Sequence, residues 1–129
     1  INTNANIGSR KPVYCTGLGK AFLAFLPEKE SREIIDQIDF EEYTHKTVRN
    51  KKDLEEQLKQ FRMQGYSIDD QEIEEGLWCA AIPIYDGSRR MVAAISVSGP
   101  IERMLSKKDK IISELLMTGK KLSEQLGYH

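Results

Sequence analysis

Two apolar runs stand close together in the sequence: LWCAAIPIY at Leu77–Tyr85 and MVAAISVS at Met91–Ser98. The segment Asp86-Gly87-Ser88-Arg89 between them is typical of a turn, so the runs predict two strands of an antiparallel hairpin. Pro83 lies inside the first run and has no N–H to donate. We therefore expect its N–H side to face a sheet edge or a bulge.

Alternation of side chains gives this hairpin two different faces. A four-residue loop would place Cys79 opposite Ser96. It would also place Leu77 opposite Ser98, on the same face. Missing volume on such a face is either filled by a neighbouring large side chain or left as a pocket. Because buried hydroxyl groups need partners, we interpret the thiol and the two serines as candidate ligand contacts. The other face carries Trp78, Ala80, Ile82 and Ile84.

Helical periodicity flanks these strands on both sides. Start and stop signals predict helices at Gly17–Leu26, about Glu28–Ile38, Asn50 to Gly65, and Ser106 to near Gly127. Thr16, Asn50 and Ser106 supply the expected N-caps. A short strand is expected at Tyr66–Asp70. This order predicts an α+β fold in which helices pack on an antiparallel sheet.

Composition narrows the class of protein. The chain has 129 residues, 40% of them hydrophobic and 30% charged, which predicts one folded domain and excludes a disordered chain. Its net charge of −1 is too balanced for a module that relies on phosphate contacts. No apolar run approaches the ~20 residues of a membrane span, and no signal peptide is visible. We expect a soluble, cytoplasmic domain with reduced cysteines, no cofactor, no metal site and no membrane contact.

Two further segments point to the face of Cys79. In YSIDDQEIEEG (66–76), Asp69 ends the short strand and can turn toward the hairpin. Thr16-Gly17-Leu18-Gly19-Lys20 stands at a helix start, where N–H groups attract anions and glycine admits a ligand. The spacing is not that of a Walker A loop, and such glycines often serve packing alone. The remaining acidic residues are expected to be solvated: Asp70, Glu72, Glu74 and Glu75.

These groups suit a small oxygenated anion, such as a 2-keto acid or sugar acid, and no step requires catalysis. Two alternatives remain. A cysteine-dependent hydrolase or thiol transferase would pair Cys79 with His45. A plain dimerisation module would use the apolar stripe of the last helix as its seam, with Ile112, Leu115, Leu122 and Leu126.

The order of four segments resembles the effector-binding domain of IclR-type bacterial transcriptional regulators: PVYCTGLGKAFLAFLP (12–27), QGYSIDD (64–70), EEGLWCAAIPIYD (74–86) and AAISVSGP (93–100). The resemblance runs from about Gly8 to Gly127. It implies a GAF-like domain with a curved sheet, a small organic acid as effector, and a repressor of a catabolic operon that is not an enzyme. It also implies dimers or tetramers, and operator DNA bound by a separate winged helix-turn-helix. The matching effector contacts are Gly17, Leu18, Asp69, Leu77, Cys79, Ser96 and Ser98.

The sequence departs from that family in two respects. It contains no helix-turn-helix, so we expect no specific DNA binding by this chain alone. The helix and hairpin that open the family's effector domain are also missing. We therefore expect residues 1–129 to form a single domain that is a fragment, with a sheet one or two strands short. An open sheet edge, or pairing with another chain, follows from that expectation.

Overall fold

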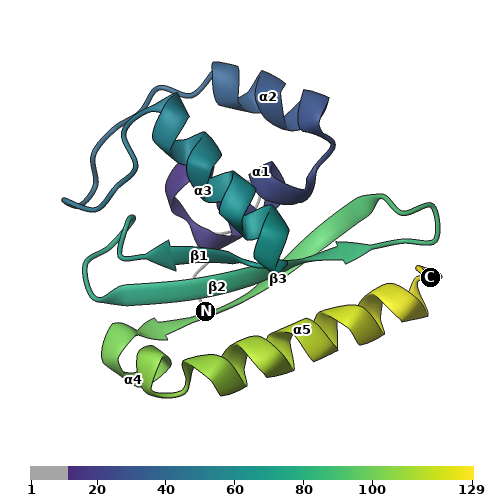
Figure 1. Ribbon diagram of the computed structural model, residues 1–129. Coiled ribbons are helices and arrows are strands. Elements are labelled where there is room, and N and C mark those ends of the chain that lie inside the picture. The colour runs from purple at the N-terminus through teal and green to yellow at the C-terminus, as the bar shows by residue number, and fades with distance from the viewer. Residues whose placement is uncertain (1–11) are drawn as a thin grey trace.

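A computed structural model describes residues 12–129 and shows an α+β fold. Its sheet has three antiparallel strands in the order β1-β2-β3: Ser67–Asp70, Leu77–Tyr85 and Met91–Pro100. Helices cover both faces of this sheet (Figure 1). The predicted fold class and all three predicted strands are confirmed. Residues 1–11 are polar with little periodicity, which predicts an arm or a loop, and this segment lies outside the described residues.

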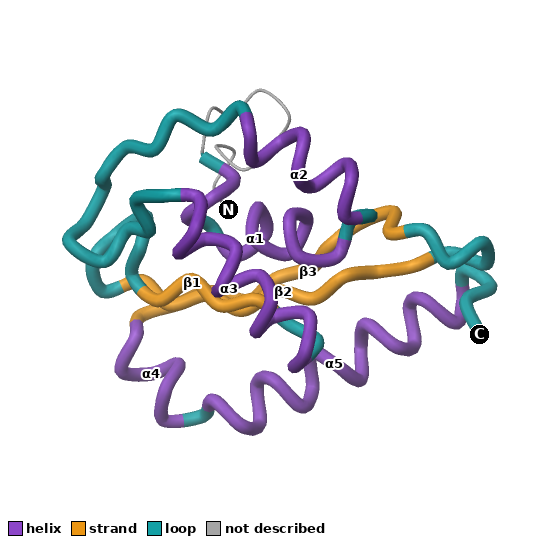
Figure 2. Tube along the Cα trace, turned by 45° about the horizontal axis from the view of Figure 1, so that its top comes forward, coloured by secondary structure: helices purple, strands orange, loops and turns teal. Residues whose placement is uncertain are grey.

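The helices divide into two layers. They are α1 (Gly17–Phe25), α2 (Glu28–Asp36), α3 (Lys51–Gln64), α4 (Ile101–Ser106) and α5 (Lys108–Gln125). The first three lie on one side of the sheet, and α4 and α5 lie on the other (Figure 2). Each layer has its own buried cluster, one around Leu23, Leu54 and Leu58, the other around Trp78, Ile82 and Leu115. The sheet therefore separates two hydrophobic cores, one on each of its faces.

Two of the predicted helix caps are present. The Thr16 hydroxyl accepts the Gly19 N–H at 3.1 Å, and the Asn50 side chain accepts the Asp53 N–H at 2.8 Å. Gly65 ends α3 with a φ of 91°, a left-handed conformation that glycine adopts without a Cβ penalty. These local signals fix both ends of α3 and the start of α1.

The predicted last helix is present as α5, but the prediction that Ser106 caps it is wrong. Pro100 precedes a short helix, α4, and the Ser106 hydroxyl donates to the Arg103 carbonyl of that helix at 2.7 Å. The N-cap of α5 is Lys107, whose side chain makes no capping bond. Ser106 is therefore the last residue of α4 and does not cap α5, because its hydroxyl is bonded to a carbonyl of α4.

The predicted hairpin register is also wrong, by two residues. The loop spans Asp86 to Arg90, closed by the Asp86 N–H donating to the Arg90 carbonyl at 2.9 Å. A register shift between Ile84 and Tyr85 adds a second offset. Cys79 therefore lies opposite Ser98, Ala81 opposite Ser96, and Leu77 opposite Pro100. A shift of two residues keeps every side chain on its predicted face.

The expectation for Pro83 agrees with the strand pairing. Pairing of β1 with β2 ends at Ala81, opposite Ser67. Pro83 lies beyond that point, where β2 pairs only with β3. A missing N–H is tolerated there because no described β1 residue stands opposite it.

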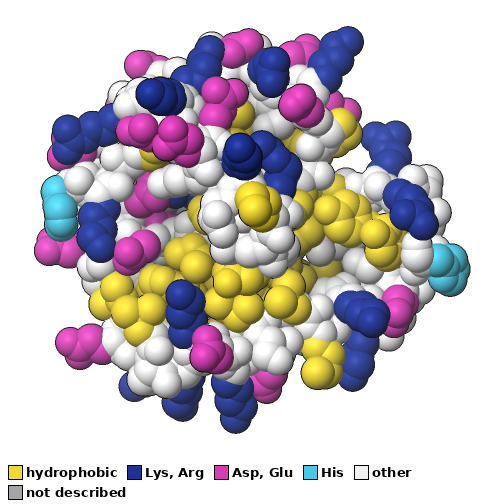
Figure 3. All heavy atoms as spheres, in the orientation of Figure 1, with side chains coloured by type: hydrophobic (Ala, Val, Ile, Leu, Met, Phe, Trp, Pro, Cys, Tyr) yellow, Lys and Arg dark blue, Asp and Glu magenta, His cyan; other side chains and the backbone are white. Residues whose placement is uncertain are grey.

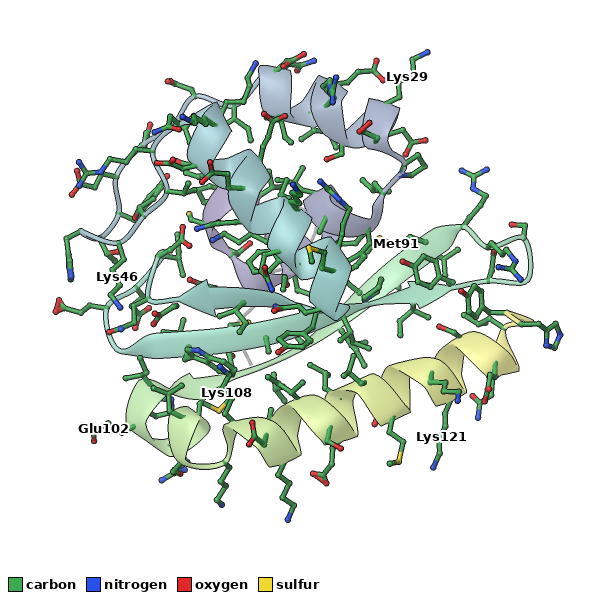
Figure 4. All side chains as sticks on the ribbon, viewed as in Figure 1. Lys29, Lys46, Met91, Glu102, Lys108 and Lys121 are labelled. Carbon is green, nitrogen blue, oxygen red and sulfur yellow. The ribbon has the colours of Figure 1, made fainter. Side chains whose placement is uncertain are left out.

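The far face of the sheet packs on α5. A Cβ built on Gly119 would lie 2.0 Å from Ile82 Cδ1, so this glycine lets the helix approach β2 closely. Ile112 and Leu115 are buried against the sheet, while Leu122 and Leu126 of the proposed seam stay exposed. Hydrophobic side chains are visible between the strands and α5 in Figure 3, and Lys121 projects away from the sheet in Figure 4. Among residues 12–129, no helix is long and apolar enough to cross a bilayer.

Candidate functional site

Three polar side chains form a row across the sheet. Asp69 lies opposite Cys79 in the pairing of β1 with β2, and Cys79 lies opposite Ser98 in the pairing of β2 with β3. Residues directly opposite in neighbouring strands point to the same face. The row is closed at one end and open at the other, because Asp69 is 1% exposed and Cys79 8% exposed, whereas Ser98 is exposed. Ser96 lies on the same face, in the adjacent row.

The start of α1 covers the middle of this row. A Cβ built on Gly17 would lie 2.5 Å from the Cys79 sulfur, so the helix backbone approaches the thiol closely. The buried Ser67 hydroxyl donates to the Gly17 carbonyl at 2.7 Å and ties the same residue to β1. Ser67 is absent from the predicted site, although strand alternation places it on the face of Asp69.

Backbone amides at the start of α1 are the groups that the sequence predicts to attract an anion. Thr16 accepts two of them, the Gly19 N–H through its hydroxyl and the Lys20 N–H through its carbonyl at 2.9 Å. The N–H groups of Gly17 and Leu18 are not used by these bonds, and the first amides of a helix have no partner within it. Free amides at a helix start, together with the positive end of the helix dipole, are groups that can bind an anion.

The remaining predicted residues lie at the border of this region. Leu18 is half-buried on α1, and Leu77 is half-buried at the start of β2. A hollow of about 580 Å³ lies elsewhere, around Val48 and Gln57, and another of about 520 Å³ lies around Phe25. Neither is lined by any of the seven predicted residues. Five of the seven lie on one face of the sheet by strand alternation, and Gly17 packs against Cys79. That the seven residues form one ligand site stays a prediction.

A buried ion pair adjoins the row and corrects one expectation. Glu72, expected to be solvated, is 5% exposed and pairs with Lys20, which is fully buried on α1. The Glu72 carboxylate also accepts the Val48 N–H at 2.9 Å and the Gln57 side-chain amide at 3.1 Å. The acidic run suggested a solvated turn because no sequence signal linked it to a lysine 52 residues away. Glu74 and Glu75 are exposed as expected.

Asp69 is bonded to the same turn. Its carboxylate accepts the Glu72 backbone N–H at 2.8 Å. Burial raises the pKa of Asp69 from 3.8 to about 6, while the Glu72 hydrogen bond and the Lys20 charge act in the opposite direction. Asp69 is thus a carboxyl group poised to change its protonation state near neutral pH.

Features required for thiol chemistry are poorly met. Burial raises the pKa of the Cys15 thiol to about 12, and nearby Asp69 and Glu72 add to that effect. Cys79 is buried under Gly17, whereas His45 is exposed on the loop between α2 and α3, next to Lys46 (Figure 4). Within residues 12–129, no three His, Cys, Asp or Glu side chains are grouped to hold a metal ion.

The fold is that of the C-terminal domains of bacterial transcriptional regulators. The C-terminal domain of Escherichia coli KdgR superposes with a TM-score of 0.86 at 34% identity, covering 95% of this chain and 75% of that one. Thermotoga maritima IclR gives a TM-score of 0.83 at 33% identity, covering 95% of this chain and 51% of that one. The chain belongs to the family described as bacterial transcriptional regulator IclR C-terminal, whose model matches residues 1–124.

Curated relatives agree with this assignment. The HTH-type transcriptional regulator KdgR of Dickeya chrysanthemi is 36% identical over 97% of this chain and 41% of its own length. The transcriptional repressor IclR of Escherichia coli is 44% identical over 81% of this chain and 38% of its own length. The chain thus spans less than half the length of these two relatives.

Proposed function

We propose that the α1 face of the sheet binds a small organic acid and that this binding regulates transcription. The ligand carboxylate would accept the N–H groups of Gly17 and Leu18. Its carbonyl or hydroxyl groups would meet Cys79 and the serines of β3. A 2-keto acid or a sugar acid offers this combination of groups. The domain would bind and release this ligand without changing it chemically.

One observation carries the proposal: Asp69, Cys79 and Ser98 stand opposite one another across three strands, beneath the first amides of α1. An acid, a thiol and a hydroxyl in a row provide donors and acceptors of different kinds within one ligand's reach. The amides above them provide charge complementarity without an arginine. The family assignment is consistent with a sensing domain at this position of the chain.

The names of its relatives support a proposal for the whole protein. One relative is named as a transcriptional repressor and another as an HTH-type regulator. We propose that the full protein is a cytoplasmic repressor of a catabolic operon, that it assembles as a dimer or tetramer, and that a separate helix-turn-helix domain contacts operator DNA. This chain would supply the sensor and no enzymatic activity.

Thermal shift and calorimetry with pyruvate, glyoxylate and 2-keto-3-deoxygluconate test the ligand assignment. An acid present at about 100 times its dissociation constant stabilises the domain by about 2.7 kcal/mol. Cys79→Ser and Ser98→Ala should each weaken that effect. Ser113→Ala, at an exposed serine of α5, is the matched control and should leave it intact. Unchanged protection in both site variants would remove Cys79 and Ser98 from the site.

Catalysis is tested separately with a thiol reagent. Cys79 should react slowly with iodoacetamide at pH 6, and His45→Ala should not change that rate. Rapid labelling that depends on His45 would support the cysteine-dependent alternative instead.

A further inference from the structure

Three charged side chains are buried together beside the proposed ligand face. Lys20 is fully buried, Asp69 is 1% exposed and Glu72 is 5% exposed. Lys20 pairs with Glu72, and the Glu72 backbone N–H donates to the Asp69 carboxylate. When all three are ionised, two carboxylates face one ammonium, and one negative charge remains uncompensated. Such a charge is costly in a buried position.

The two carboxylates are not equivalent. Glu72 accepts from three donors, the Lys20 ammonium, the Val48 N–H and the Gln57 amide. These donors, one of them a cation, compensate the negative charge of the Glu72 carboxylate. Asp69 accepts the neutral Glu72 N–H. Asp69 is therefore the carboxylate of the cluster whose negative charge is less well compensated, and the one whose protonation would stabilise the cluster more.

Other charged or titratable groups near Asp69 do not supply a compensating positive charge. Asp70 on β1 adds a like charge, and the Cys15 thiol lies within electrostatic reach in the turn before α1. Cys79, opposite on β2, brings a thiol. Within residues 12–129, Lys20 is the cation that acts on Asp69, and Glu72 already holds it.

A bound acid would bring a second negative charge to this neighbourhood. The Gly17 backbone lies against the Cys79 sulfur, and Cys79 stands opposite Asp69. A carboxylate held by the first amides of α1 would thus lie one strand away from the Asp69 carboxyl. Like charges at such separations disfavour each other, most strongly where water is excluded.

We propose that Asp69 takes up a proton when the site binds an organic acid, so that the anion enters a cluster made neutral. This inference rests on the proposed function and adds the charge state of the site to it. A protonated Asp69 would also gain an O–H donor for a ligand oxygen. The pKa of Asp69, raised to about 6 by burial, makes this proton available at low cost near neutral pH.

The number of protons taken up on binding is measured by calorimetry in two buffers of different ionisation enthalpy, because the binding heat differs between them in proportion to that number. The probes are pyruvate, glyoxylate and 2-keto-3-deoxygluconate, and the tightest binder is studied at several pH values. At pH 7 the wild-type chain should take up more than half a proton per acid bound. Its affinity should fall by up to about tenfold per pH unit above pH 6.

Two variants and one control assign this proton. Asp69→Asn keeps an acceptor for the Glu72 N–H and should bind with no proton uptake. Asp70→Asn makes the same chemical change at the neighbouring position, half-buried and paired with Lys46, and should change the proton count far less than Asp69→Asn does. Glu72→Gln frees the Lys20 charge to act on Asp69, lowers the Asp69 pKa, and should reduce uptake at pH 7. A merely structural role of Glu72 would not change the count.

The outcomes separate this inference from the proposed function. Acid binding with no proton uptake in the wild type, or with equal uptake in Asp69→Asn, overturns the inference and leaves the function in place. Absence of binding by all three probes overturns both. If Asp69→Asn does not fold, the proton counts of the wild type and Glu72→Gln decide.

Discussion

The contact between Gly17 and Cys79 gives a direct test of how α1 sits on the sheet. In Gly17→Ala the new Cβ would meet the Cys79 sulfur at 2.5 Å and its Cβ at 3.3 Å. Carbon atoms do not approach sulfur this closely, so the helix start must lift or the thiol must rotate. Overpacking of this kind costs about 1–3 kcal/mol. The gain in helix propensity from glycine to alanine, about 1 kcal/mol at most, offsets only part of that loss.

A double-mutant cycle isolates this contact. Cys79→Ala removes the sulfur, which makes the closest approach, and leaves the 3.3 Å neighbour in place. In this background Gly17→Ala should cost at least about 1 kcal/mol less than in the wild type. Urea unfolding of the four proteins, with unchanged slopes, measures the coupling.

A second cysteine provides the control for this cycle. Cys15 is fully buried, but its atoms are not among the three nearest to a Cβ at Gly17. Gly17→Ala should therefore couple less strongly with Cys15→Ala than with Cys79→Ala. If Gly17→Ala couples no more strongly with Cys79→Ala than with Cys15→Ala, the close approach of Gly17 to Cys79 is refuted. The position of the start of α1 over the row is then refuted as well.

Three further outcomes follow from buried groups. Lys20→Met leaves the Glu72 carboxylate without its cation and should cost about 3–5 kcal/mol in urea unfolding, and the double variant with Glu72→Gln should cost less than the sum. The pKa of Asp69 is raised from 3.8 to about 6, so its contribution to stability is present below pH 3.8 and is lost as the pH rises to about 6. Asn cannot ionise, so the Asp69→Asn variant does not lose stability in this way as the pH rises. The free energy of unfolding of the variant minus that of the wild type should therefore increase by roughly 2–3 kcal/mol between pH 4 and pH 7. Gly119→Ala drives a Cβ into Ile82 Cδ1 and should cost about 1–3 kcal/mol, part of which Ile82→Val should restore.

Local chemistry made much of the fold predictable. Thr16, Asn50 and Gly65 act within one helical turn, so their effect is readable from neighbouring residues. The faces of β2 were predictable because alternation has a period of two, and a register error of two residues preserves it. The register itself was not, since it depends on how Asp86 and Arg90 close the loop and on a bulge beside Tyr85.

Candidate site residues divide in the same way. Cys79 and the serines of β3 were placed on one face by alternation, and Gly17 was recognised as a helix start. Glu72 was misread as solvated because its partner, Lys20, stands 52 residues earlier in the chain. Ser67 was overlooked because a buried hydroxyl looks like any strand serine until its acceptor, the Gly17 carbonyl, is known.

Helices, the hairpin and the face that carries the polar groups of the strands are all encoded locally. Those properties depend on backbone preferences and side-chain periodicity, which extend over a few residues. Contacts between distant segments became known from the folded chain alone: Asp69 with Cys79, Cys79 with Gly17, and Lys20 with Glu72. Such contacts arise from the packing of segments distant in the chain. In this packing Lys20 pairs with Glu72, and burial raises the proton affinity of Asp69, which has no cation of its own.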